Sequence, residues 1–257
     1  MSLHSLAAQG FSAAADAYER GRPDYPPQAI EILTDALRLH AGRVLLDLGA
    51  GTGKMTRLLV SSGVRLIAVE PVEEMRQKLA GATPGLEILD GVAEAIPLPD
   101  ASVDAVIAAQ SFHWFHADLA LPEIHRVLRP EGRVALVWNM RDTGVAWVAR
   151  LSEILDRHGR EAPHYRGFAW RADLSTSPLF EPVAEREVSH TQELDAEGLA
   201  ERAASISYIA ALPTAERLAV LREVRQLAAE HPDLRGRPTF AFPYRTVVAI
   251  YACRTMR

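Results

Sequence analysis

The stretch LLDLGAGTGK, from Leu45 to Lys54, limits the possible folds of this chain more than any other part of the sequence. An apolar run leads into three alternating glycines, Gly49, Gly51 and Gly53, and an amphipathic segment follows them. A strand, a glycine turn and a helix in this order form the first unit of an open α/β sheet, which binds ligands beyond the carboxyl ends of its strands. We therefore expect a ligand-binding crevice beside these glycines.

Apolar runs typical of strands alternate with helical patterns between residues 43 and 139. The expected strands cover 43–48, 65–69, 86–89, 103–109 and 133–139, and the expected helices cover 54–61, 72–80 and 118–128. Near-continuous apolar strands separated by helices are typical of a parallel sheet that is covered on both faces and joined by right-handed crossovers. The sequence thus predicts a doubly wound, Rossmann-like α/β fold.

The sequence on either side of this alternation adds helices and two more strands. Residues 1–40 contain two helical patterns, separated by prolines in GRPDYPP that rule out one continuous helix. Residues 145–159 and 195–230 have apolar residues at helical spacing, whereas 179–194 and 240–254 resemble a closing antiparallel pair of strands. We expect a helical lid over 1–40, a binding core over 41–140, and a late helical insertion with closing strands over 141–257 that covers the substrate.

Composition excludes several functional classes. The net charge of -5, with no basic run, gives no reason to expect a nucleic-acid partner. Cys253 is the only cysteine, which excludes an internal disulfide and a multi-cysteine zinc site, and His158 and His164 have no partner at metal spacing. No leader or spanning apolar run is evident. We expect a cytoplasmic monomer or homodimer that acts on a small molecule, without metal, membrane or nucleic acid.

The spacing of the glycines indicates the kind of ligand. A dinucleotide fingerprint is G-x-G-x-x-G, but Lys54 stands where the third glycine would be. Asp47 would repel a phosphate in the crevice, whereas Glu70, about 20 residues beyond the first glycine, is placed to bind ribose hydroxyls. A cationic, phosphate-free nucleoside such as S-adenosylmethionine fits this pattern. A plain tight turn with a surface carboxylate, or an NAD-dependent dehydrogenase, are the alternatives.

Four stretches carry a resemblance to a known family: YERGRPDYP, LLDLGAGTGK, GVAEAIPLPDASVDAV and AAQSFHWF, which begin at residues 18, 45, 91 and 108. On these residues the chain resembles the class I S-adenosylmethionine-dependent methyltransferases of the type-11 group, in the trans-aconitate methyltransferase-like branch. The resemblance covers residues 1–140, and FPYRTVVAIYACR resembles the family's closing strand. It implies a mostly parallel seven-stranded sheet with an antiparallel last strand.

The resemblance also implies the cofactor, S-adenosyl-L-methionine, with S-adenosyl-L-homocysteine as product. It places Asp47 at the methionine amine, Glu70 at the ribose and Arg22, in the N-terminal lid, at the methionine carboxylate. Val92 stands where the family often has an acidic residue for the adenine amine, so backbone groups nearby are expected to bind adenine. The expected cofactor contacts are Tyr18, Arg22, Tyr25, Asp47, Gly49, Ala50, Gly51, Gly53, Glu70, Pro71, Met75, Val92, Ala93, Glu94, Gln110 and Ser111.

The acceptor side is expected around the SFHWF cluster. His113 is a candidate general base and Trp114 a candidate apolar wall near the sulfonium, although both residues could simply pack the loop. Arginines of the late segment could clamp an anionic substrate, or could be ordinary solvated residues. The candidate substrate contacts are His113, Trp114, Arg141, Tyr165 and Arg166, and Arg171 of the same late segment could also take part in the clamp.

These expectations lead to one reaction with several alternatives. The chain should transfer a methyl group to an oxygen of a small molecule by in-line displacement, and the trans-aconitate likeness implies a carboxylate. A carboxylate acceptor needs no base, whereas a hydroxyl or an acidic carbon does. The alternatives are a C-methyltransferase of quinone-type substrates and a non-catalytic S-adenosylmethionine-binding regulatory protein.

Overall fold

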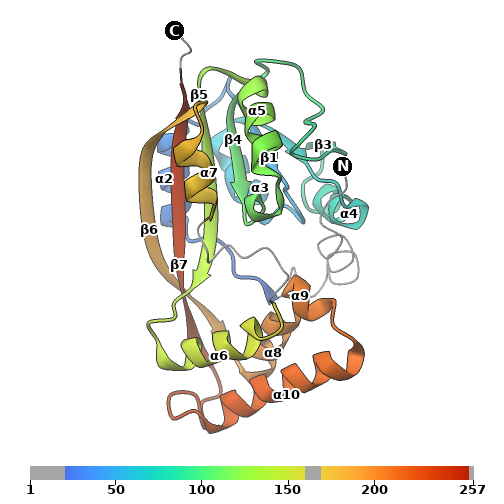
Figure 1. Cartoon of the computed structure of the whole chain (residues 1–257), viewed down its shortest axis with the longest axis vertical. Helices are drawn as coiled ribbons and strands as arrows, with labels where there is room; N and C mark the ends of the chain where they lie inside the picture. Colours follow the sequence, from blue (N-terminus) through green and yellow to red (C-terminus); the bar gives the residue numbers. More distant parts are fainter. Residues whose placement is uncertain (1–20, 160–168, 255–257) are drawn as a thin grey trace.

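One sheet of seven strands organises the part of the chain that the computed structural model describes, residues 21–159 and 169–254 (Figure 1). The strands are β1 Val44–Leu48, β2 Arg65–Val69, β3 Glu87–Leu89, β4 Val103–Ala109, β5 Leu128–Arg141, β6 Phe180–Leu194 and β7 Phe240–Cys253. They lie in the order β3-β2-β1-β4-β5-β7-β6. The first five run parallel, and β7 pairs antiparallel with both β5 and β6. The predicted sheet is confirmed.

Five helices of the described residues flank this sheet. They are α2 Pro27–Ala36, α3 Lys54–Leu59, α4 Glu73–Ala82, α5 Ala117–Val127 and α7 Ala169–Thr176. Proline at the first position of α2 has no N–H to leave unpaired, so it suits a helix start. The N-terminus of α5 is satisfied differently, because Glu94 Oε1 accepts a hydrogen bond of 2.7 Å from the backbone N–H of His116.

Side chains of the central strands alternate between two apolar cores, one on each face of the sheet. Leu46 of β1 belongs to the core that includes α5 and α7, whereas its neighbour Leu45 belongs to the core that includes α2 and α3. Every residue of β1 is buried, as expected for a parallel strand that is covered on both faces.

The helix α2 differs from the expected lid over residues 1–40. Ala29, Leu33 and Leu37 are buried against the sheet in the same core as Leu45 and Ile107. The apolar face of α2 therefore belongs to the sheet domain, because exposing it would lose the free energy of burying these side chains. Residues 1–20 lie outside the described residues.

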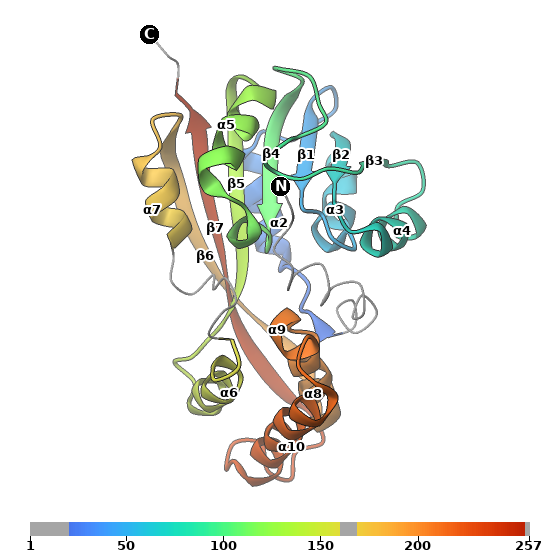
Figure 2. The same ribbon diagram turned by 45° about the vertical axis from the view of Figure 1, so that its right-hand side comes forward.

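The later helices form a second lobe beyond the carboxyl ends of β1 and β4, as Figures 1 and 2 show. They are α6 Ala146–Asp156, α8 Ala196–Ala204, α9 Ser207–Ala210 and α10 Thr214–Glu230. This lobe has its own core, in which Trp147, Leu199 and Val224 pack with Phe242 from the start of β7. The helix α7 stays with the sheet instead, since Leu174 is buried in the α5 core.

Candidate functional site

The glycine loop, residues 49–53, joins β1 to α3, and each of its three glycines has a positive φ, between 59° and 85°. A Cβ on Gly49 would lie 2.7 Å from Ser111 Cβ, and one on Gly53 would lie 2.2 Å from Leu79 Cδ1. A Cβ on Gly51 would meet no atom within 4 Å. Gly49 and Gly53 are therefore required by packing within the protein, whereas Gly51 leaves its space open to a ligand.

Two buried carboxylates lie beside this loop, one at the end of β1 and one after β2. Glu70 accepts hydrogen bonds from the backbone N–H of Gly51 at 2.8 Å and from that of Val72 at 3.0 Å. Asp47 accepts a hydrogen bond of 2.5 Å from the Thr56 hydroxyl. Both side chains are oriented by the protein before any ligand binds.

Burial controls the charge of these carboxylates. Loss of hydration raises the pKa of Asp47 to about 7, against an opposing hydrogen bond from Thr56 and with a smaller rise caused by the charge of Glu70. Loss of hydration also raises the pKa of Glu70, although its two backbone hydrogen bonds oppose the shift. A cationic ligand beside these groups would restore their ionised forms.

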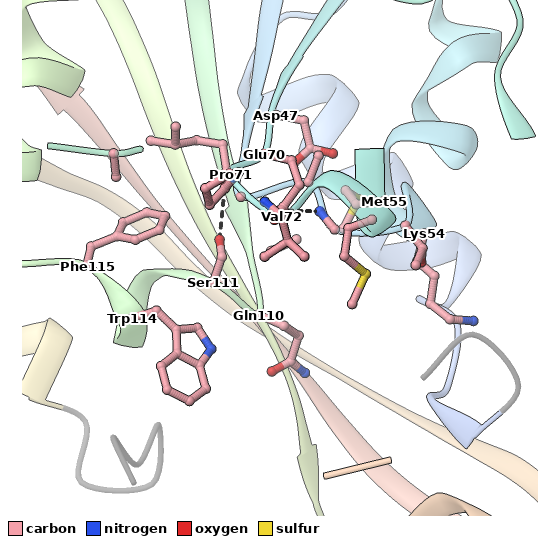
Figure 3. A pocket seen from close by; sticks show the side chains of 18 of the residues that line it. Asp47, Lys54, Met55, Glu70, Pro71, Val72, Gln110, Ser111, Trp114 and Phe115 are labelled. Carbon is pink, nitrogen blue, oxygen red and sulfur yellow. Dashed lines mark hydrogen bonds between the residues drawn. The ribbon is translucent and has the colours of Figure 1, made fainter. Parts of the chain in front are cut away.

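The end of β4 forms another wall of the site. Gln110 has φ of 59°, which is uncommon for a residue other than glycine, and its side chain donates a hydrogen bond of 3.1 Å to the Asn139 carbonyl. The Ser111 hydroxyl donates to the Leu48 carbonyl at 2.8 Å, which ties β4 to β1. Figure 3 shows Trp114 and Phe115 on the opposite side of the pocket from Met55 and Lys54.

Residues 21–25 cross over this site and are held from several directions. Arg22 Nη2 donates to the Ser205 carbonyl at 3.3 Å, and Asn139 Nδ2 donates to the Asp24 carbonyl at 3.2 Å. Lys54, the first residue of α3, forms an ion pair of 2.9 Å with the Asp24 carboxylate. The short segment thus connects the glycine loop, β5 and the helical lobe.

These walls enclose one cavity of about 1190 Å³, including its opening to solvent. The expected residues that line it are Arg22, Tyr25, Asp47, Gly49, Ala50, Gly51, Glu70, Pro71, Met75, Val92, Ala93, Glu94, Gln110, Ser111 and Trp114. The structure therefore brings together residues that are far apart in the sequence. Their individual roles toward a cofactor stay predictions.

Several expected residues lie elsewhere. Gly53 supports the start of α3 rather than the cavity surface. The ring of His113 lies 5.0 Å from that of Trp114, and His113 does not line the cavity, so its role as base remains a prediction without geometric support. Arg141 pairs with Asp156 at 3.1 Å, away from the cavity.

The remaining four expected contacts are one arginine that does not line the cavity and three residues whose positions are not described. Arg171, in α7, pairs with Glu185 of β6, which explains its position without a substrate. Tyr18, Tyr165 and Arg166 lie outside the described residues.

Other residues that line the cavity were not expected from the sequence. Most are sequence neighbours of expected residues or follow a strand: Pro23, Leu48, Thr52, Lys54, Met55, Val72, Gly91, Ala109, Phe115, His116 and Asn139. The position of Asn139 near the carboxyl end of the predicted fifth strand was a usable signal. Arg202 also lines the cavity, but no local sequence pattern distinguishes it from the other arginines of its helical segment.

Two kinds of feature are absent from residues 21–159 and 169–254. No group of three histidine, cysteine or acidic side chains there is arranged to hold a metal ion. No helix among the same residues has the length and apolarity needed to cross a bilayer.

Comparison with known proteins adds evidence to this geometry. The model of a methyltransferase domain matches residues 46–136. An uncharacterized methyltransferase of Mycobacterium tuberculosis is 45% identical over 237 residues, which cover 92% of this chain and 93% of that protein. A methyltransferase-like protein of Schizosaccharomyces pombe is 36% identical over 231 residues, 90% of each chain. The structure of a type II methyltransferase from Anaeromyxobacter dehalogenans has a TM-score of 0.70 at 26% identity, covering 91% of this chain and 97% of that one.

Proposed function

The chain belongs to the methyltransferase-domain family, and on that premise we propose that it is an S-adenosylmethionine-dependent methyltransferase whose acceptor is a carboxylate oxygen of a small molecule. One observation carries the choice of cofactor: Gly51, Asp47 and Glu70 line the same cavity, with open space at the Gly51 Cα. Two carboxylates beside a bare backbone favour a cationic nucleoside and disfavour a pyrophosphate. The same carboxylates therefore argue against an NAD-dependent dehydrogenase.

The residues present fit this cofactor. Glu70 would hold the ribose hydroxyls, because two backbone hydrogen bonds already fix its carboxylate. Asp47 would face the methionine amine and Arg22 the methionine carboxylate, while Val92, Ala93 and Glu94 line the same cavity. S-adenosylmethionine supplies a methyl group on a sulfonium, which is a strong leaving group. The protein then has to hold the acceptor in line and exclude water, a proximity effect that can reach roughly 7 to 11 kcal/mol.

A carboxylate acceptor is favoured because it requires no base. The expected base, His113, does not line the cavity, and His116, which does, is an exposed residue at the start of α5. A carboxylate is already ionised at neutral pH, whereas a hydroxyl or an acidic carbon must lose a proton. Trp114 and Phe115 would exclude water from the reacting groups.

The experiment is transfer from methyl-labelled S-adenosylmethionine to a panel of carboxylic acids, phenols, alcohols and quinones. A carboxylate product is a methyl ester, so mild base should release its label as methanol, whereas ethers and C-methyl products keep the label. If the product were entirely stable to base, the acceptor would not be a carboxylate. If the His116→Ala variant also failed to form this base-stable product, the acceptor would be a hydroxyl or a carbon. Tight S-adenosylhomocysteine binding without any transfer would indicate a non-catalytic binding protein.

A further inference from the structure

Arg202, on α8, is a buried cation at the side of the cavity formed by the helical lobe. Only 5% of the residue is exposed, and it lines the same cavity as the glycine loop. Its Nε donates a hydrogen bond of 3.0 Å to the Tyr244 hydroxyl, but its Nη1 is buried and has no hydrogen-bond partner. A buried guanidinium nitrogen left unbonded costs free energy, so its retention requires a reason.

No acidic side chain among the described residues neutralises Arg202. None of their carboxylates lies within 4.0 Å of its guanidinium, in contrast to Arg141, which pairs with Asp156 nearby. Tyr244 does not supply the missing charge, because burial raises the pKa of its hydroxyl and keeps it protonated. That hydroxyl donates to Gln192 Oε1 at 3.3 Å while it accepts from Arg202.

The Arg202 side chain is held rigidly in this position. Its guanidinium carbon lies 5.9 Å from the centre of the Tyr244 ring, and that ring stacks on His190 and packs against Phe242. A cation fixed in advance loses little entropy when it binds an anion, which increases affinity.

The two ends of the cavity thus carry opposite charge. Asp47 and Glu70 lie at the glycine loop, whereas Arg202 lies on the lobe and Arg22 reaches the α8 end at the Ser205 carbonyl. A ligand that bridges these ends has a cationic part toward the sheet and an anionic part toward the lobe. A singly charged carboxylate matches one unneutralised guanidinium, whereas a phosphate dianion would meet stronger repulsion from Asp47 and Glu70 than a carboxylate does.

We propose that Arg202 determines acceptor specificity by binding a carboxylate group of the methyl acceptor through its buried, unbonded Nη1. This inference rests on the proposed methyltransferase function and adds the residue that selects the acceptor. Arg202 therefore contributes to acceptor binding and not to binding of the cofactor.

The test measures binding of two small carboxylates, succinate and benzoate, to the complex of the full chain with S-adenosylhomocysteine. Succinamide and benzamide serve as neutral probes of the same shape. Thermal unfolding of the wild-type complex should shift upward with the acids and not with the amides. In Arg202→Gln the dissociation constant of the acids should rise roughly 10- to 150-fold, the effect of losing hydrogen bonds between charged groups.

Two variants accompany this measurement. Arg202→Lys keeps the charge without the planar fork and should fall between the wild type and Arg202→Gln. Arg150→Gln removes an exposed arginine that pairs with Glu153 and should bind the acids like the wild type. In all variants the dissociation constant of S-adenosylhomocysteine should stay within about twofold of wild type.

Distinct outcomes would overturn distinct claims. Equal binding of acids by wild type and Arg202→Gln, or equal binding of acids and amides by wild type, would overturn the role of Arg202. Weaker S-adenosylhomocysteine binding in Arg202→Gln would overturn it too, because Arg202 would then hold the methionine carboxylate. A wild-type chain that fails to bind S-adenosylhomocysteine at all would refute the proposed function itself.

Discussion

At the scale of single residues, the site is built from groups that are unfavourable in the absence of a ligand. Asp47 and Glu70 are carboxylates deprived of water, Arg202 is a guanidinium without a counter-ion, and Gln110 has a left-handed backbone. Each feature costs stability and is retained at the same cavity. Such features concentrate where a protein binds or transforms another molecule.

The ionisation of Asp47 links stability to pH. Its pKa is about 7 in the folded protein and about 3.8 when unfolded, so folding favours the protonated form. Stability from this group is therefore lost as pH rises from 4 to 7, by an amount on the order of 4 kcal/mol. We expect Asp47→Asn to stabilise the protein in urea unfolding at pH 8 and to make little difference at pH 4.

The control for this experiment is Glu181→Gln, which neutralises an exposed carboxylate on β6. It should change the free energy of unfolding by less than about 0.5 kcal/mol at either pH. If Asp47→Asn and Glu181→Gln had the same pH dependence, Asp47 would not be the titrating group. Asp47→Asn should also weaken S-adenosylhomocysteine binding, since the ligand's amine would lose its anionic partner.

Because Gly51, unlike Gly49 and Gly53, has open space beside it, replacing it should weaken ligand binding far more than it lowers protein stability. Gly51→Ala places a methyl group in open space at φ of 59°, so it should cost only ~1 to 2 kcal/mol of stability while displacing the ligand. Gly85 has φ of 83°, is exposed and also has open space around it, so Gly85→Ala has a matched backbone cost far from the cavity. Calorimetry should find S-adenosylhomocysteine binding weakened at least ~100-fold in Gly51→Ala and unchanged in Gly85→Ala. Similar affinities in both variants would remove Gly51 from the site.

At the scale of elements, the carboxyl ends of the strands fix the site, and strands were the part that the sequence predicted best. The runs expected at 43–48, 65–69 and 103–109 match β1, β2 and β4 to within one residue, because their apolar residues are buried on both faces. The strand β5 instead begins at Leu128, five residues early, since the chain bulges at Glu131, with φ of 63°, before resuming its pairing with β4. Local patterns do not reveal such a bulge.

Glu70 follows β2 and accepts a hydrogen bond from Gly51 in the glycine loop. Replacing Glu70 tests whether this connection between the two elements supports cofactor binding. Glu70→Gln keeps the shape of the side chain but loses a charged acceptor, so S-adenosylhomocysteine should bind more weakly by ~1 to 3 kcal/mol, roughly 5- to 150-fold. Glu87→Gln, on the neighbouring strand β3, removes an exposed carboxylate that pairs with Arg65 and should leave affinity unchanged. An unaltered dissociation constant in Glu70→Gln would argue against a ribose contact.

At the scale of the whole molecule, the sequence predicted that a helical insertion would follow the core. It did not predict which residues the insertion would contribute to the cavity. The apolar stripe of 195–230 indicated a buried face, yet it is divided among α8, α9 and α10, and Leu218 is exposed. In the sequence, Arg202 occupies a position typical of the polar face of an amphipathic helix. Arg202 is buried by tertiary packing, in which it hydrogen-bonds to Tyr244 of β7, and contacts between segments so far apart are not encoded in any local pattern.

Because the helical lobe has a core separate from the two cores of the sheet, we expect that cofactor and acceptor binding can be perturbed separately. Trp147 packs against Phe240 and Phe242 in the lobe, so Trp147→Ala should cost ~3 to 5 kcal/mol, confined mainly to that lobe. Hydrogen exchange should then accelerate in α8 and α10 but not in β1 or β4.

Leu121→Ala, in the α5 core, is the matched change on the sheet and should have the opposite distribution of exchange rates. Trp147→Ala should retain S-adenosylhomocysteine binding, because Asp47 and Glu70 are held by the sheet, and should lose the thermal shift caused by benzoate, because Arg202 is held by the lobe. Equal acceleration of exchange in both cores would mean that the molecule opens as one cooperative unit. In that case the lobe could not open for acceptors while the sheet keeps its cofactor.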